Sequence, residues 1–118
     1  MAIVVTTPQA GRAGFIANGT SADASGCEEL QAAPPAGFAI LVDHVTFNCG
    51  SSALSITLGA GKNGAAVTTA LIGPIAMAAN TSLQWDFTFG MALAAATALT
   101  IDASGAGAIC VFARGRIV

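Results

Sequence analysis

The stretch at residues 82–89, which reads Ser-Leu-Gln-Trp-Asp-Phe-Thr-Phe, indicates the fold class more clearly than any other part of the chain. Its leucine, tryptophan and phenylalanines alternate with glutamine, aspartate and threonine. Because successive side chains of a β-strand point to opposite faces, this alternation predicts a strand with one apolar and one polar face. An exposed aromatic row could stack on sugars, but strict alternation with polar residues favours burial. We therefore expect Trp85 to lie in the core.

Shorter strands are predicted on both sides of this stretch. Residues 53–58 alternate in the same way, and Asn63-Gly64 behind them is typical of a tight hairpin, because both residues accept positive φ angles. Further strands are expected at residues 67–71, 75–79, 99–102 and 108–113, and a strand or extended link at residues 91–98. Roughly seven to nine short strands without alternating helices indicate an all-β fold, an antiparallel β-sandwich or barrel. Its predicted core contains Leu54, Ile56, Leu58, Leu83, Trp85, Phe87, Ile109 and Val111.

Residues 38–48 predict a long strand near the middle of a sheet. Strict alternation places Leu41, Val45 and Phe47 with Asp43 on one face, and Phe38, Ile40, Val42 and His44 on the other. Both faces are apolar at the start of the strand and more polar toward its end. This pattern predicts a central strand that is covered on both sides over its first half.

Residues 1–36 differ in composition from the rest of the chain. Glycine, asparagine and serine recur at short intervals, and Pro34-Pro35 ends the segment. Residues 3–5 and 15–17 are candidate short strands within it. We expect residues 1–36 to form an irregular N-terminal arm that wraps the domain, and residues 37–118 to form the sandwich.

Charged residues are unusually scarce. The 118 residues include four basic and six acidic ones, which is 8% of the chain. Soluble domains usually carry charged residues at about a quarter to a third of their surface positions. Large parts of the surface must therefore consist of small neutral residues, and such a surface is easily desolvated. We expect it to be covered by other protein subunits in the working state.

The charge pattern also excludes several kinds of partner. The four cations are scattered along the chain, so the basic patch that nucleic-acid binding requires is not predicted. A basic amphipathic helix that would bind a membrane surface is missing, and no apolar run approaches the roughly 18 residues needed to cross a bilayer. The first residues lack the features of a signal peptide, so we expect the chain to work in an assembly built in the cytoplasm.

Residues that could support catalysis or metal binding are few. His44 is the one histidine, and a catalytic triad would need a carboxylate to orient it. Its neighbour Asp43 is expected to point to the opposite face, so Asp86 or Asp102 would have to reach it from another strand. We expect His44 at a sheet surface or subunit seam. No catalytic, cofactor or metal site and no small-molecule substrate are predicted, and the chain is not expected to be an enzyme.

The cysteines show neither a disulfide framework nor a zinc pattern. Cys27, Cys49 and Cys110 are widely spaced and form no Cys-x-x-Cys motif. We expect reduced, half-buried thiols, while a Cys49–Cys110 bridge in an oxidised sample stays open. Residues 59–64, Gly-Ala-Gly-Lys-Asn-Gly, lack the spacing of a phosphate-binding loop and are expected to form a hairpin tip.

The second part of the chain resembles a known group of proteins. The resemblance rests on six segments, residues 45–47, 54–59, 69–75, 79–82, Trp85 and 98–111. Together these resemble small virion proteins of tailed bacteriophages, the capsid cement or decoration proteins, over residues 37–118. The resemblance implies a jelly-roll fold and trimers that sit on the shell, and it carries over no catalytic residue. Residues 1–36 would then be an arm that grips a neighbour.

Composition and resemblance agree on a structural role. The leading hypothesis is a homotrimeric cement or decoration subunit that binds the major capsid protein or other virion subunits and is located in the virion, assembled in the host cytoplasm. A tail, fibre or head–tail component is an alternative within the same class. A carbohydrate-binding β-sandwich module that uses Trp85 is an alternative from another class.

Overall fold

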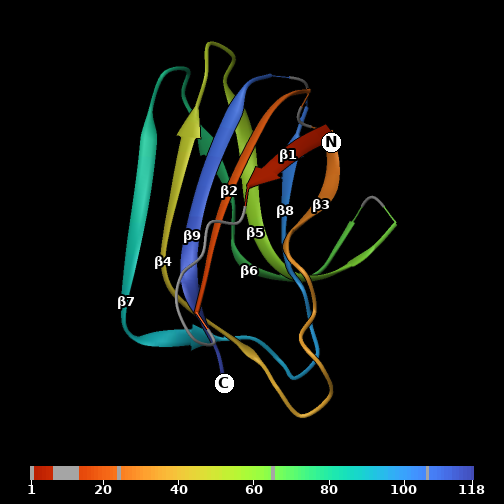
Figure 1. Cartoon of the computed structure of the whole chain (residues 1–118). Coiled ribbons are helices and arrows are strands. Elements are labelled where there is room, and N and C mark those ends of the chain that lie inside the picture. Colours follow the sequence, from red (N-terminus) through yellow and green to blue (C-terminus); the bar gives the residue numbers. More distant parts are fainter. Residues whose placement is uncertain (1, 7–13, 24, 65, 106) are drawn as a thin grey trace.

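The described residues of the computed structural model, 2–6, 14–23, 25–64, 66–105 and 107–118, form nine strands and no helix (Figure 1). No helix that could span a membrane is found among them. The strands are β1 (Ala2–Thr6), β2 (Gly14–Asp23), β3 (Ser25–Gln31), β4 (Ile40–Cys49), β5 (Leu54–Asn63), β6 (Ala66–Met77), β7 (Ser82–Ala92), β8 (Leu99–Ser104) and β9 (Ile109–Ile117).

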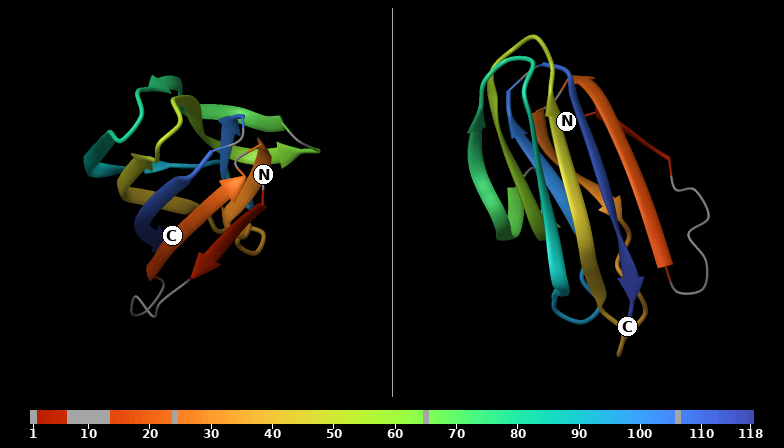
Figure 2. Two further views of the ribbon diagram at one scale, coloured as in Figure 1. Left: turned by 90° about the horizontal axis from the view of Figure 1, so that it is seen from above. Right: turned by 90° about the vertical axis from the view of Figure 1, so that its left-hand side faces the viewer.

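Two antiparallel sheets pack face to face, as the two views of Figure 2 show. One sheet has the order β1-β2-β9-β4-β7, and the other has the order β3-β8-β5-β6. Apart from β1, the chain passes from one sheet to the other at every connection except the hairpin between β5 and β6. In each sheet, strands from the first part of the chain lie next to strands from the last part, as in an eight-stranded jelly roll. The structure therefore confirms the all-β sandwich and its jelly-roll character, with β1 added beside β2.

The core lies between the sheets and is almost wholly aliphatic. Its fully buried side chains come from both layers, and the largest are Phe47, Ile40, Ile56, Leu58, Leu99, Ile101, Val42, Val45 and Val111. Thr100 is the one fully buried polar side chain among the described residues, and its hydroxyl donates to the Gly61 carbonyl oxygen at 2.9 Å. This hydrogen bond removes the penalty of burying an unpaired hydroxyl. The predicted core residues Leu54, Ile56, Leu58, Ile109 and Val111 are all buried.

The N-terminal segment contributes more to the sandwich than the sequence predicts. β2 pairs with β9 in one sheet and β3 pairs with β8 in the other, so residues 14–23 and 25–31 belong to the sandwich. The expectation of an irregular arm over residues 1–36 is therefore wrong for residues 14–23 and 25–31. Residues 7–13 and 24 lie outside the described residues. The core-facing positions of β2 are Phe15, Ala17 and Gly19, which are buried. Small residues at such positions look like turn residues in the sequence.

The inner strand β4 changes register once along its length. Its pairing with both β7 and β9 shifts between Val42 and His44, which places a bulge at Asp43. Ile40 and Val42 are buried before the bulge, and Val45, Phe47 and Cys49 are buried after it. The two faces predicted by strict alternation are therefore wrong. The expectation that both faces are covered over the first half of the strand is also wrong, because Leu41 and Asp43 on the outer face are only half-buried. One inward face runs through the bulge, and His44 lies on the outer face.

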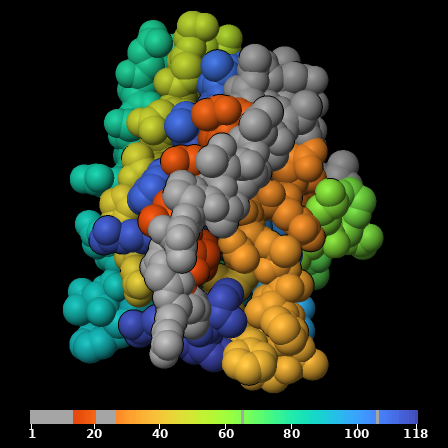
Figure 3. Space-filling model, in the orientation of Figure 1, coloured from red at the N-terminus to blue at the C-terminus, as the bar shows by residue number. Residues whose placement is uncertain are grey.

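The hairpin of β5 and β6 confirms that the chain turns back after Asn63, but Asn63 still pairs with Ala66, and of the two predicted turn residues only Gly64 has a positive φ, of +64°. β6 runs as one strand through residues 66–77, where the sequence predicts two shorter strands. Gly59 is needed in β5 because a Cβ there would lie 1.9 Å from the Val67 side chain, so only glycine lets the two strands come together. Figure 3 shows the end of this hairpin, in green, standing out from the side of the molecule.

The strand β7 forms the outer edge of the five-stranded sheet, and its apolar row is only partly buried. Trp85 and Phe87 are half-buried and pack against the core, whereas Leu83 is 40% and Phe89 92% exposed. The prediction that Leu83 lies in the core is wrong. An edge strand has one sheet neighbour, so fewer side chains cover its inward face. Met91 and Ala92 complete β7, and the expected extended link after them is interrupted by a turn at Ala95 and Ala96, where Ala96 has a φ of +54°.

Candidate functional site

His44 takes part in a short chain of hydrogen bonds on the outer face of the five-stranded sheet. Its Nδ1 lies 2.6 Å from Oδ1 of Asp86 on β7, and its Nε2 lies 2.7 Å from Oγ1 of Thr46. Phe112 of β9 meets the imidazole edge-on, with ring centroids 5.9 Å apart. Of the two carboxylates that the sequence left open, the register of β4 and β7 selects Asp86, which stands directly opposite His44.

Asp86, His44 and Thr46 are hydrogen-bonded in the sequence carboxylate, imidazole, hydroxyl, as in a catalytic triad. Their surroundings, however, are those of an ordinary side-chain interaction between two neighbouring strands. The aspartate side chain is 72% exposed, so water competes for the carboxylate. Thr46 lies two positions from His44 on the same strand, where alternate side chains stand next to each other. Asp86 and Thr46 therefore hold the imidazole ring of His44 in place, and the bond between His44 and Asp86 connects β4 to β7.

The three cysteines are free thiols. Cys27 is buried on β3, and this burial raises the pKa of its thiol, an effect that a hydrogen bond with Thr100 partly offsets. Cys49 is also buried, and its thiol donates to the Ser52 carbonyl oxygen at 3.2 Å. Only Cys110 is half-buried, as the sequence predicts for all three.

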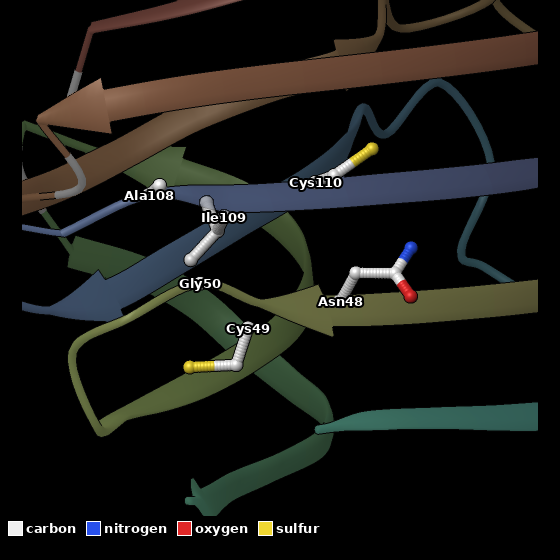
Figure 4. A pocket seen from close by; sticks show the side chains of 6 residues that line it. All are labelled: Asn48, Cys49, Gly50, Ala108, Ile109 and Cys110. Atoms are coloured by element: carbon white, nitrogen blue, oxygen red, sulfur yellow. The ribbon is translucent and has the colours of Figure 1, made fainter. Parts of the chain in front are cut away.

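The Cys49–Cys110 bridge that the sequence left open is not formed. Asn48 stands opposite Cys110 and Cys49 stands opposite Ile109, so the two cysteines are one register position apart on neighbouring strands. Alternation then directs one side chain into the core and the other toward the outer face. Figure 4 shows the two sulfur atoms pointing away from each other. In the described part of the chain, no three His, Cys, Asp or Glu side chains gather closely enough to hold a metal ion.

Trp85 is only partly accessible for stacking on a sugar. It is half-buried on β7 and packs against Phe47 in an edge-to-face arrangement, with ring centroids 5.4 Å apart and planes at 67°. This geometry is the preferred one for a packed aromatic pair. Among the aromatic side chains of β7, only Phe89 is freely accessible.

The exposed Phe89 results from the same register shift in the pairing of β4 and β7. Val42 pairs with Met91 and His44 pairs with Asp86, so residues 87–90 of β7 lie opposite the single residue Asp43. The extra residues arch away from β4 and carry Phe89 outward. Gly90 has a φ of +80°, and a Cβ there would lie 2.5 Å from the Leu41 side chain, so glycine is needed to shape this arch.

Three of the four exposed large apolar side chains of the described residues lie toward one end of the five-stranded sheet, whereas Leu83 lies toward the other. Phe38 (50% exposed) precedes β4, Phe89 (92%) lies in the arch of β7 and Val118 (54%) follows β9. Leu41 pairs with both Ala92 and Arg116, which brings these segments to the same end. We call these three residues the apolar end. The sequence predicts a buried Phe89, and Gly90 is the one signal of the arch.

A shallow hollow of about 170 Å³ lies at the opposite ends of β4 and β9. Its lining is almost entirely apolar and is formed by Asn48, Cys49, Gly50, Ala108, Ile109 and Cys110 (Figure 4). Main-chain hydrogen bonds fix it, because Gly50 donates to Ala108 at 2.8 Å and accepts from Asn80 at 2.7 Å. A Cβ on Gly50 would lie 2.8 Å from that of Ala108, so glycine allows the two segments to meet. Sequence reasoning did not identify this hollow.

The chain therefore presents surfaces suited to contact, with an apolar end, an apolar hollow and a histidine fixed on a sheet face. Comparisons with family models, with curated proteins and with solved structures find no match to this chain.

Proposed function

We propose that the chain is a structural virion protein that binds and stabilises a bacteriophage capsid as a cement or decoration subunit. The observation that carries this proposal is the sparse charge on the surface of a jelly roll. The accessible surface is 5757 Å² and the chain has ten charged residues, which is about one charge per 580 Å². Jelly rolls also occur in lectins and other proteins, so the fold alone does not decide the function.

A neutral surface of small residues suits a protein that is covered on several sides. Removing water from alanine, glycine, serine and threonine costs less than removing it from lysine or glutamate. Such residues also allow two backbones to come close together. The proposed partners are further copies of the chain, as a homotrimer, and the major capsid protein or another virion subunit. The proposed location is the virion, which is assembled in the host cytoplasm.

Stabilisation of a shell needs no chemistry. A subunit that binds two neighbouring capsid proteins adds contacts that must break before the shell opens, so it favours the closed state by mass action. Each interface with a neighbour should bury about 800 Å² per partner, the usual size of a specific interface. The exposed Phe89 fits this role because aromatic side chains often dominate the binding energy of such interfaces.

The proposal is tested on particles of the virus whose genome encodes the chain. Particles that lack the protein should bind purified chain at a fixed number of copies per shell and should then open at a higher temperature. Chain recovered only with tails would support the tail or fibre alternative. Specific binding to a glycan, with none to shells or tails, would support the carbohydrate-binding alternative.

A further inference from the structure

We propose that copies of the chain associate head to tail, with Phe89 of one copy seated in the hollow at Gly50 and Ala108 of the next. The inference rests on the self-association part of the proposed function and names the surfaces that carry it. Phe89 is the most exposed large apolar side chain among the described residues, and the hollow is an unfilled apolar surface. Phe89 of one copy could therefore fill the hollow of another copy and lose its own exposure to water.

The hollow measures about 170 Å³. A closed apolar cavity of about 150 Å³ is known to hold a benzene molecule. This hollow is shallow and open, so it can receive one face of a phenyl ring without enclosing the ring. The lining has no charged side chain, and Asn48 is the one polar side chain in it. Burying Phe89 there displaces water from apolar surface on both sides without burying a charge.

Phe89 cannot reach the hollow of its own chain. The arch lies opposite Asp43, and the hollow begins at the far end of β4, at Asn48 and Cys49. Six residues of strand separate Asp43 from Cys49, which corresponds to about 20 Å. This distance exceeds the reach of a phenylalanine side chain. The contact must therefore join two molecules.

The placement also defines the symmetry of the contact. The two surfaces lie about 20 Å apart along β4, so each copy uses a different surface toward each neighbour. Such a heterologous contact forms a closed ring when the rotation from one copy to the next divides a full turn into equal steps. The smallest ring with more than two copies is a trimer. A twofold contact of Phe89 with Phe89 would leave the hollow empty.

The test uses one variant for each surface. Phe89→Ala removes the ring, and Ala108→Leu fills the hollow from an exposed position, so both chains should fold. We expect each variant to raise the dissociation constant of self-association at least about 30-fold, which corresponds to about 2 kcal/mol. Thr88→Ala and Ala70→Leu, at exposed positions of β7 and β6, are the matched controls and should associate as the unmodified chain does. Analytical ultracentrifugation and native mass spectrometry give the readout.

Mixing the two variants makes the test specific. Phe89→Ala keeps a usable hollow and Ala108→Leu keeps a usable phenylalanine, so the mixture should form one-to-one pairs that do not close into rings. Absence of these pairs, or a Phe89→Ala chain with unchanged association, would overturn the inference. An unmodified chain that is monomeric at tens of micromolar yet coats shells would overturn it and leave the proposed function standing. Association through Phe89 without any binding to shells would support the inference and overturn the proposed function.

Discussion

The contact between Phe47 and Trp85 offers a quantitative test of how β7 is held on the sandwich. Phe47 is completely buried, so Phe47→Ala should reduce the free energy of unfolding by about 3–5 kcal/mol. Trp85 is half-buried on an edge strand, so Trp85→Ala should remove roughly half as much, about 2 kcal/mol. The edge-to-face geometry adds about 0.5–1.5 kcal/mol of coupling between the two rings. The double variant should therefore lose less stability than the two single losses added together.

Urea unfolding of the four chains of this cycle provides the measurement, at concentrations where every chain is monomeric, because association would raise the apparent stability. Phe89→Ala on the same strand is the control and should change the free energy of unfolding by less than about 0.5 kcal/mol. A Trp85→Ala chain as stable as Phe89→Ala, or exact additivity in the double variant, would refute the packing of the indole on Phe47.

Three further changes test other parts of the structure. Gly115→Ala should lower stability by about 2–3 kcal/mol in thermal melts, because the added Cβ would lie 1.9 Å from a main-chain carbonyl oxygen. A smaller loss than for Gly37→Ala would contradict this. Gly37 has open space around it, so only its φ of +88° opposes alanine, by about 1–2 kcal/mol. Asp86→Asn should cost less than about 1 kcal/mol in urea unfolding, since its exposed carboxylate is only one member of a surface tie, and a larger loss would show a structural role for the charge. In the folded chain Cys110 should react with a thiol reagent well before the two buried thiols, and a native reaction that survives Cys110→Ser would refute the burial pattern.

Strands that follow plain alternation could be predicted from the sequence. In β5, Leu54, Ile56 and Leu58 face the core while Ser55 and Thr57 are half-exposed, so the period of two survives intact. The glycine and asparagine after them mark the hairpin because their backbone preferences are local. Both signals depend only on residues close together in the chain.

Features that depend on pairing between distant strands could not be predicted. The bulge at Asp43 moves Val45 and Phe47 to the face that Ile40 and Val42 also use, and a change of register leaves no mark in residue polarity. For β2 the sequence predicts only the short strand at residues 15–17, because the buried positions Ala17 and Gly19 have little apolar surface of their own.

The candidate surfaces were predicted less well than the fold. The sequence narrows the partner of His44 to two aspartates, and only the register of β4 and β7 selects Asp86. Phe89 continues an apolar row and so resembles a core residue, although the arch turns it outward. The hollow is formed by residues about sixty positions apart, Gly50 and Ala108, and by small side chains that give no periodic signal.

The pairing of β2 with β9 joins residues near the two ends of the chain, since Gly14 stands opposite Arg116. Ribosomes add roughly 5–20 residues per second, so β2 is made several seconds before its partner exists. Through that interval one edge of β2 and one edge of β4 have no strand to bind, because β9 lies between them in the finished sheet. The nascent chain cannot close its larger sheet before β9 has been made, and folding is expected to be slow for its length, as it is for proteins whose strands pair across long distances in the sequence.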